Sequence, residues 1–234
     1  MIKNSGAFFK GLIIAMCFLG LLFLIFSPVF GDGRNGLVYA DDMFNKLAKG
    51  SSHFIPALLA GNQKNQDKTI SVTFSMDKAE EAELAGKLIT TAGVKAVVDK
   101  GAISMEGSLG KLIGAVLEDS ELMFQNDADK IKSRYEQPGK VVMKAWWGAL
   151  SKMVKKLEKD GKINEAKAIN NVVKKAVEPA YNFYGIQPQN VSDKILLMIA
   201  LLVFYVFYTI MWGYAIFFMF EGLGLSMTKA KLKH

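Results

Sequence analysis

Residues 195–220 read ILLMIALLVFYVFYTIMWGYAIFFMF, a run of twenty-six residues without a charged side chain. A second uncharged run, GLIIAMCFLGLLFLIFSPVF, occupies residues 11–30. A helix of about 20 apolar residues crosses the hydrocarbon core of a bilayer, so each run is long enough to span a membrane. The sequence therefore predicts two transmembrane helices with the polar part of the chain between them.

The first apolar run has two other interpretations. Lys10 precedes it and Val38-Tyr39-Ala40 follows it, as in a secretory signal peptide with its cleavage site. This site lies ten residues beyond the run, which is farther than signal peptides usually allow. A lipoprotein signal at Cys17 fails because Met16 stands where a small residue is needed. We therefore expect a retained span, with a secretory signal as the alternative.

Lysines flank the spans at the ends of the chain, and positively charged flanks stay in the cytoplasm. We therefore expect a protein of the bacterial inner membrane with both termini cytoplasmic and residues 31–192 in the periplasm. The lysines that carry this prediction are Lys3, Lys10, Lys229, Lys231 and Lys233.

The expected fold class is an α+β membrane protein, with two transmembrane helices flanking an exported ferredoxin-like (βαββα) subdomain and an αα-hairpin. The expected segments are a cytoplasmic tail (1–10), the first transmembrane helix (11–30), a periplasmic α/β subdomain (31–136), a periplasmic helical hairpin (137–192), the second transmembrane helix (193–220) and a basic cytoplasmic tail (221–234).

The order of elements in the α/β subdomain follows from its hydrophobic periodicity. Residues 70–76 alternate apolar and polar side chains, which predicts a half-buried strand. A helix is expected over 77–93, and two strands over 94–98 and 102–106 joined by the turn residues Asp99-Lys100-Gly101. Another helix is expected from about Ser108. Before these elements, we expect a short helix over 41–48 closed by Gly50 and an exposed loop over 51–68.

This order resembles the split βαβ topology of heavy-metal-associated domains over residues 69–118. Those domains bind metal through paired cysteines in the loop after the first strand. Here that loop reads MDKAEEAE, without cysteine, so the resemblance implies a fold and no metal-binding role.

Residues 137–194 carry eleven lysines against five acidic residues, a net charge of +6. Pro138 is expected to start the first helix of the hairpin, and Pro179 to kink or end the second. A basic surface near a membrane favours anionic lipids or an acidic protein over nucleic acid. We expect Trp147 to contact a partner there, unless both Trp146 and Trp147 pack against the α/β subdomain. The lysines expected beside Trp147 are Lys144, Lys152 and Lys155.

Polar-tipped side chains form a stripe on the second predicted span. Tyr205, Tyr208, Thr209 and Trp212 follow an i, i+3, i+4, i+7 spacing and share one helix face. Because a phenol in hydrocarbon needs a hydrogen-bond acceptor, we expect other integral membrane subunits to cover this face. Local hydrogen bonds in a simple anchor helix, or a bound lipid or quinone, are the alternatives.

Few residues favour catalysis or cofactor binding. The two histidines, His53 and His234, are expected on opposite sides of the membrane. The carboxylate pairs Glu80-Glu81, Asp41-Asp42 and Glu118-Asp119 are expected at helix ends or on exposed faces. We therefore expect no enzyme, metal or cofactor. Neither span holds a charge near its centre to carry ions.

The expected function is that of a non-enzymatic accessory or scaffold subunit of an inner-membrane complex. The first alternative is a self-assembling periplasmic regulator, because the topology is similar to that of polysaccharide co-polymerases. The chain departs from that family in having no Pro/Gly-rich pattern at the second span, with no proline after Pro188. A sensor acting through a partner and an enzyme are further alternatives.

Overall fold

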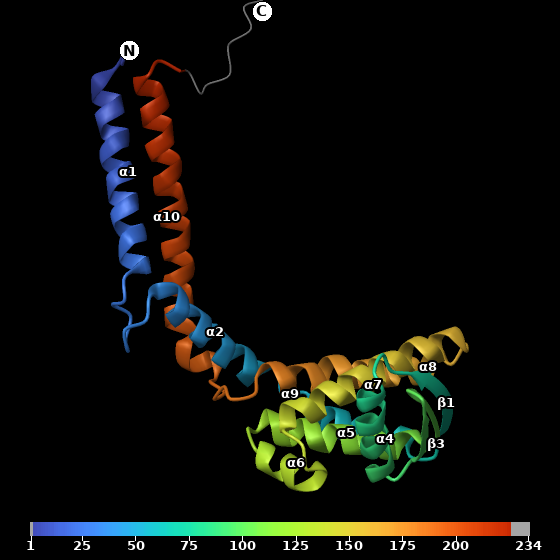
Figure 1. Cartoon of the computed structure of the whole chain (residues 1–234). Helices are drawn as coiled ribbons and strands as arrows, with labels where there is room; N and C mark the ends of the chain where they lie inside the picture. The colour runs from blue at the N-terminus through green and yellow to red at the C-terminus, as the bar shows by residue number, and fades with distance from the viewer. Residues whose placement is uncertain (1, 226–234) are drawn as a thin grey trace, which may run out of the picture. The chain divides into compact units, whose positions relative to one another are not determined.

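A computed structural model describes residues 2–225 (Figure 1). The predicted basic flank at Lys229, Lys231 and Lys233, and His234, lie outside the described residues. The chain divides into two compact units, Met1–Leu47 with Gln189–His234, and Ala48–Pro188.

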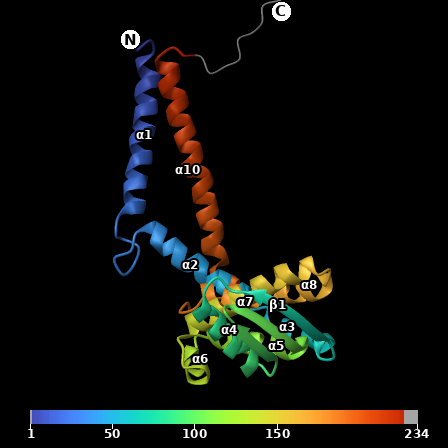
Figure 2. The ribbon, with the colours of Figure 1, turned by 45° about the vertical axis from the view of Figure 1, so that its right-hand side comes forward.

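The first unit contains two long apolar helices, α1 (Ser5–Phe26) and α10 (Ile195–Gly222), which lie side by side in Figures 1 and 2. They run antiparallel, because the backbone N–H groups of Lys3 and Asn4 donate to the carbonyl of Gly222 at 2.8 and 3.0 Å. A short 3-10 turn, η3 (Val191–Lys194), precedes α10. Both helices are long and apolar enough to cross a membrane.

Helix α2 (Gly36–Ser51) is longer than predicted at both ends. At its start, the side chain of Asn35 accepts a hydrogen bond from the N–H of Val38 at 2.9 Å, as an N-cap does. At its end, the helix continues through Gly50, the predicted stop. A glycine inside a helix is unfavourable by only about 1 kcal/mol relative to alanine, so tertiary contacts of the neighbouring residues are enough to extend it.

The second unit contains a three-stranded antiparallel sheet made of β1 (Thr69–Ser75), β2 (Lys95–Asp99) and β3 (Ala102–Ser108), in the order β1-β3-β2. The three strands and the helix α4 (Ala79–Thr91) between the first two confirm the predicted order. Lys100 and Gly101 both have positive φ, 45° and 89°, as a two-residue hairpin turn of type I′ requires. Among residues 2–225 the sheet has no fourth strand.

Helices cover one face of the sheet. The apolar residues of β1, Ile70, Val72 and Phe74, alternate with exposed polar residues and are buried. The helices α4, α5 (Leu109–Phe124) and α7 (Gly139–Lys159) contact the strands (Figure 2). One continuous hydrophobic cluster extends from Ile55 to Ala180, so the helical hairpin and the sheet share a core.

The predicted exposed loop over 51–68 is wrong for most of its length. Residues Ile55–Gly61 form helix α3 and Asn62–Asn65 form a 3-10 turn, η1. Pro56 lies in the first turn of α3, where its missing N–H is of no consequence. Ile55 is buried, and so are Asn62 and Asn65 at 4% exposure each. The polar composition of this stretch predicted exposure, so the burial of these two amide side chains was not predicted.

The helical hairpin follows α6 (Ala128–Tyr135) and consists of α7 and α8 (Ile163–Val172). Pro138 is the N-cap of α7, close to its predicted role. Beyond α8 the chain forms a π-helical turn (Val173–Val177) and then α9 (Glu178–Asn182). The helix does not end at Pro179, which lies in the first turn of α9 directly after the π turn. The missing N–H of a proline is tolerated in a first turn.

Candidate interaction surfaces

Small residues allow α1 and α10 to approach closely. A Cβ atom added at Gly11 would lie 2.6 Å from the backbone nitrogen of Met219. One added at Gly222 would lie 2.6 Å from the Cα atom of Phe8. Side chains larger than hydrogen at these two positions would therefore push the helices apart. Such close approach is the usual basis of helix association in lipid, where apolar burial gives no driving force.

Two of the four residues of the predicted stripe pack against α1. The ring of Phe18 stacks on Tyr208 with centroids 4.1 Å apart, and its centroid lies 4.6 Å from that of Trp212. The Tyr208 hydroxyl is buried and has no hydrogen-bond partner among residues 2–225. Phe18 of the same chain therefore contacts both rings, while Trp212 stays 42% exposed. The phenol group of Tyr208 finds no acceptor within residues 2–225.

The other two residues of the stripe, Tyr205 and Thr209, are exposed. The hydroxyl of Thr209 donates to its own helix, with the carbonyls of Tyr205 and Val206 at 3.0 and 2.9 Å. The hydroxyl of Thr209 is therefore satisfied within its own helix, as in the alternative of local hydrogen bonds. Tyr205 is 63% exposed, and its ring is free to contact another molecule.

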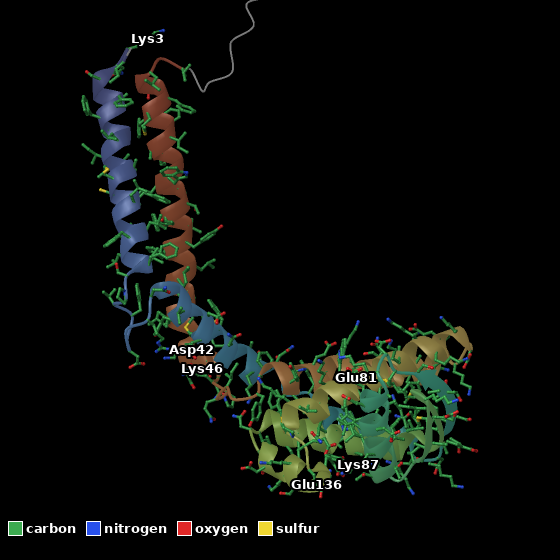
Figure 3. All side chains as sticks on the ribbon, in the orientation of Figure 1. Lys3, Asp42, Lys46, Glu81, Lys87 and Glu136 are labelled. Carbon is green, nitrogen blue, oxygen red and sulfur yellow. The ribbon has the colours of Figure 1, made fainter. Side chains whose placement is uncertain are left out.

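The part of α2 that belongs to the first unit is charged on one side. The carboxylate of Asp42 accepts hydrogen bonds from Lys46 at 2.7 Å and from Arg34 at 3.0 Å. Figure 3 shows Asp42 and Lys46 close together on this helix. The hydrogen bond from Lys46 lowers the pKa of Asp42, with a further contribution from Arg34. This side of α2 is therefore held by an ion-pair cluster.

The opposite side of α2 forms an apolar groove with α10. The groove has a volume of about 570 Å³ and reaches Tyr205. Phe44 of α2 is 47% exposed beside it. The groove therefore extends the exposed surface around Tyr205 toward α2. Its other lining residues are Ala40, Ile195, Met198, Ile199, Leu201 and Leu202.

The adjacent tryptophans of α7 have different environments. Trp146 is fully buried, and its indole N–H donates to the carboxylate of Asp119 at 2.9 Å. Trp147 is 47% exposed, and its N–H donates to Glu178 at 3.1 Å. Neighbouring residues on a helix point about 100° apart, which accounts for the difference. Of the two alternatives for this pair, the structure excludes the burial of both rings.

The lysines predicted to accompany Trp147 are divided. Lys144 lines a cavity of about 340 Å³ together with Trp147 and Tyr181. Lys152 donates to Asp77 at 2.7 Å, so this ion pair neutralises its charge. Lys155 is exposed. The cavity next to Trp147 is therefore lined by one lysine, Lys144, and one carboxylate, Glu178, and Lys155 lies farther along the helix.

Asp119 is the centre of a buried polar network that joins three helices. Its carboxylate accepts hydrogen bonds from Arg134 at 2.8 Å, from the hydroxyl of Tyr135 at 2.7 Å and from the indole of Trp146. Burial raises the pKa of Asp119, although the hydrogen bonds from Trp146 and Tyr135 act in the opposite direction. Close to this network, Lys87 of α4 pairs with Glu136 at 3.3 Å (Figure 3).

The prediction that Asp119 lies on an exposed helix face or helix end is wrong. It is fully buried in the interior of α5, whereas the side chain of its neighbour Glu118 is 64% exposed. The sequence carries a signal for this, because Asp119 follows Leu112 and Val116 at i+7 and i+3, on the apolar face of the helix. A carboxylate on that face requires buried donors.

Lys49 is a second buried charge that the sequence did not reveal. It is 1% exposed, and its ammonium donates to Asn126 at 3.0 Å and to the carbonyls of Phe183 and Ile186 at 3.0 and 2.7 Å. All three of its donors are therefore satisfied. Burial lowers the pKa of Lys49. The contacts fasten the end of α2 to the segment that follows α9.

Residues 2–225 contain no group of three or more His, Cys, Asp or Glu side chains placed to hold a metal ion. His53 lies 2.8 Å from Glu121 and stacks on the ring of Phe124. This arrangement pairs the imidazole with one carboxylate on the surface of α5.

Comparison of the chain with protein-family models, curated proteins and solved structures finds no match.

Proposed function

We propose that the chain is a two-pass protein of a bacterial inner membrane, with both termini in the cytoplasm and residues 31–192 in the periplasm. The antiparallel packing of α1 and α10 supports this, because it brings the start of α1 next to the end of α10. Lys3 and Lys10 flank the first span on that side. Positive flanks of this kind are retained in the cytoplasm.

Within the membrane, we propose that the chain is a non-enzymatic accessory or scaffold subunit that binds another integral membrane protein. The observation that carries this proposal is the exposed ring of Tyr205, at 63% exposure. It lies ten residues after Ile195, the start of α10, which is about 15 Å along a helix. At that depth a phenol hydroxyl gains most from an acceptor on a neighbouring helix. The apolar groove beside it would admit the partner's side chains or lipid tails.

The exposed ring of Trp147 is the second proposed contact. Tryptophan is over-represented at the centres of protein interfaces because its large ring is ordered at low entropic cost. With Lys144 and Lys155 it would contact an acidic protein surface or anionic lipid headgroups. These contacts add specificity outside the hydrocarbon.

We also propose that the sheet and its helices form an incomplete ferredoxin-like subdomain. Strands β1 and β2 each pair antiparallel with β3, which lies between them. The two outer strands are therefore parallel and joined through α4, as in a split βαβ unit. This supports the resemblance in topology and says nothing about activity.

Affinity purification in mild detergent tests the membrane contact. Tyr205→Leu should release co-purifying membrane proteins, because it removes the hydroxyl and changes the shape of the outward face. Phe207→Leu is the matched control, since Phe207 is also exposed and lies on another side of α10. Equal recovery of partners with both variants would contradict the proposal.

The native mass of the purified particle distinguishes the self-assembling alternative. A mass that is a whole multiple of the chain's 25.8 kDa, without other chains, would favour a homo-oligomeric regulator. Other polypeptides in fixed proportion would favour the accessory-subunit proposal.

A further inference from the structure

A cleft in the second unit lies between η1, α3, α5 and α8. Its volume is about 680 Å³, within the range of about 300–1,000 Å³ typical of small-molecule sites. The membrane contact and the surface around Trp147 involve none of its residues. Its floor is apolar, formed by Leu58, Ile113 and Val172.

The rim of the cleft is positively charged. Lys64, Lys68 and Lys167 line it, and no acidic residue is among its lining residues. None of the three lysines forms an ion pair within residues 2–225. Three cations without counter-charges in one concave site favour an anionic ligand, and a lysine ammonium binds phosphate as a point charge.

Helix α8 adds neutral polar groups to the same cleft. Asn164, Lys167 and Asn171 follow an i, i+3, i+7 spacing, so they lie on one face of the helix. All three line the cleft. An amide side chain both donates and accepts hydrogen bonds, which suits hydroxyl groups on a ligand.

Asn65 provides an acceptor with no partner. The amide nitrogen of Asn62 donates to the carbonyl of Gly110 at 2.8 Å, so the oxygen of Asn62 must face Asn65. The nitrogen of Asn65 donates to that oxygen at 3.2 Å. The side-chain oxygen of Asn65, Oδ1, is buried and has no partner among residues 2–225. Because the carbonyl of Gly110 fixes both amide orientations, exchanging the oxygen and nitrogen of Asn65 would not remove the unsatisfied group.

We propose that this cleft binds a phosphorylated polyol, with Lys64, Lys68 and Lys167 on the phosphate and the asparagines on the hydroxyl groups. A hydroxyl that donates to Asn65 would satisfy an acceptor that has no partner among residues 2–225. The apolar floor fits the C–H groups of the polyol. The same chemistry occurs in soluble polyol phosphates and in glycerophosphate lipid headgroups.

Calorimetric titration of the full chain in neutral detergent with glycerol 3-phosphate tests the proposal. The double variant Lys64→Gln, Lys167→Gln should bind at least about tenfold more weakly, because it loses two charge-assisted contacts. A tenfold loss of affinity corresponds to about 1.4 kcal/mol. Lys174→Gln is the matched control, an exposed lysine next to α8 that does not line the cleft. It should change the affinity less than about twofold.

Two further titrations sharpen the result. Inorganic phosphate should bind about 2–10-fold more weakly than glycerol 3-phosphate, because it lacks the polyol hydroxyls and their hydrogen bonds. Vesicles containing phosphatidylglycerol, compared with phosphatidylcholine alone, identify the source. Competition by phosphatidylglycerol assigns a lipid headgroup, and its absence assigns a soluble polyol phosphate.

No heat of binding with glycerol 3-phosphate, or equal affinity in the wild type and the double variant, would overturn the proposal. Equal affinity for phosphate and glycerol 3-phosphate would overturn its polyol part. An unchanged far-ultraviolet circular dichroism spectrum and melting temperature would show that the double variant is folded. The proposal does not depend on a membrane partner, so it can fail or succeed independently of the proposed function.

Discussion

The apolar hairpin of α1 and α10 and the domain of residues 48–188 are stabilised in different ways. In the hairpin, glycines bring two backbones together, and one buried hydroxyl, that of Tyr208, has no partner in the described part of the chain. In the domain, side chains pack around buried charges, Asp119 and Lys49, each held by three hydrogen bonds.

On the proposed membrane topology, the difference follows from the solvent around each region. Water drives apolar side chains into a core, and the domain can then position polar groups within it. Lipid supplies no such drive, so two helices associate through close packing. In the domain the polar side chains that stabilise the fold are buried, as at Asp119. In the hairpin the polar side chain proposed to bind a partner, Tyr205, is exposed.

The largest effect is expected from removing the indole at the centre of the domain. Trp146→Ala should lower the free energy of unfolding by about 3–5 kcal/mol, because it leaves a large cavity. Denaturant unfolding of the full chain in detergent measures this. Trp147→Ala is the matched control and should cost less than about 1 kcal/mol. Similar losses from both variants would show that the two rings are equally buried.

The buried carboxylate gives the domain a distinctive pH dependence. Asp119→Asn should cost about 1–3 kcal/mol, because an amide cannot accept all three hydrogen bonds. Because the folded pKa of Asp119 is raised, the folded state binds its proton more readily than the unfolded state. The contribution of Asp119 to stability therefore falls as pH rises from the unfolded value of 3.8 through the folded pKa.

Unfolding measured from about pH 4 to pH 8 checks this sign. The stability difference between the wild type and Asp119→Asn should be largest at the acidic end. Glu118→Gln, at the exposed neighbouring position, should show no such trend. A difference that grows with rising pH would mean that the pKa of Asp119 is lowered by folding.

The hairpin should respond to steric changes that the domain would not sense. Gly11→Leu should destabilise the contact of α1 with α10 by about 1–3 kcal/mol, because the new side chain meets the backbone of Met219. Hydrogen exchange read by mass spectrometry should show faster exchange in residues 5–26 and 195–222, and unchanged exchange in 69–124. Gly20→Leu is the control, since no atom lies within 4 Å of a Cβ at Gly20. Equal effects at both glycines would contradict the packing.

The smallest effect is expected at Tyr208. Tyr208→Phe removes a buried hydroxyl that has no partner among the described residues. The change should be neutral or stabilising by up to about 1 kcal/mol in thermal unfolding of the detergent-solubilised chain. A loss of more than 1 kcal/mol would show that the hydroxyl has an acceptor in the intact protein.

Much of the secondary structure was predictable because the periodicity of residues 70–113 is clear and its turn residues are specific. For example, the predicted hairpin turn at Lys100 and Gly101 has the positive φ values that such a turn requires. The extent of α2 and the presence of α3 were not predictable. The residues around both include glycine, asparagine and serine, which are typical of loops, and long-range contacts determine the conformation of both. The buried amides of Asn62 and Asn65 bond to each other and to Gly110, far away in sequence.

The predicted sites were limited in the same way. Spacing alone placed four residues on one face of α10, but it could not show that Phe18 contacts Tyr208 and Trp212. The sequence offered Trp147 as the exposed ring, but burial of both rings stayed open, because it depends on which side of α7 meets the core. Of the buried charges Asp119 and Lys49, the burial of Asp119 could have been predicted from its position on an apolar helix face.

The comparison depends on α1 and α10 lying in a bilayer while residues 48–188 lie in water outside the cytoplasm. Alkaline phosphatase, which is active only outside the cytoplasm, tests this directly when fused after residue 190 or after residue 225. The account predicts activity from the fusion at 190 and none from the fusion at 225. An inactive fusion at 190, or activity at both positions, would contradict it.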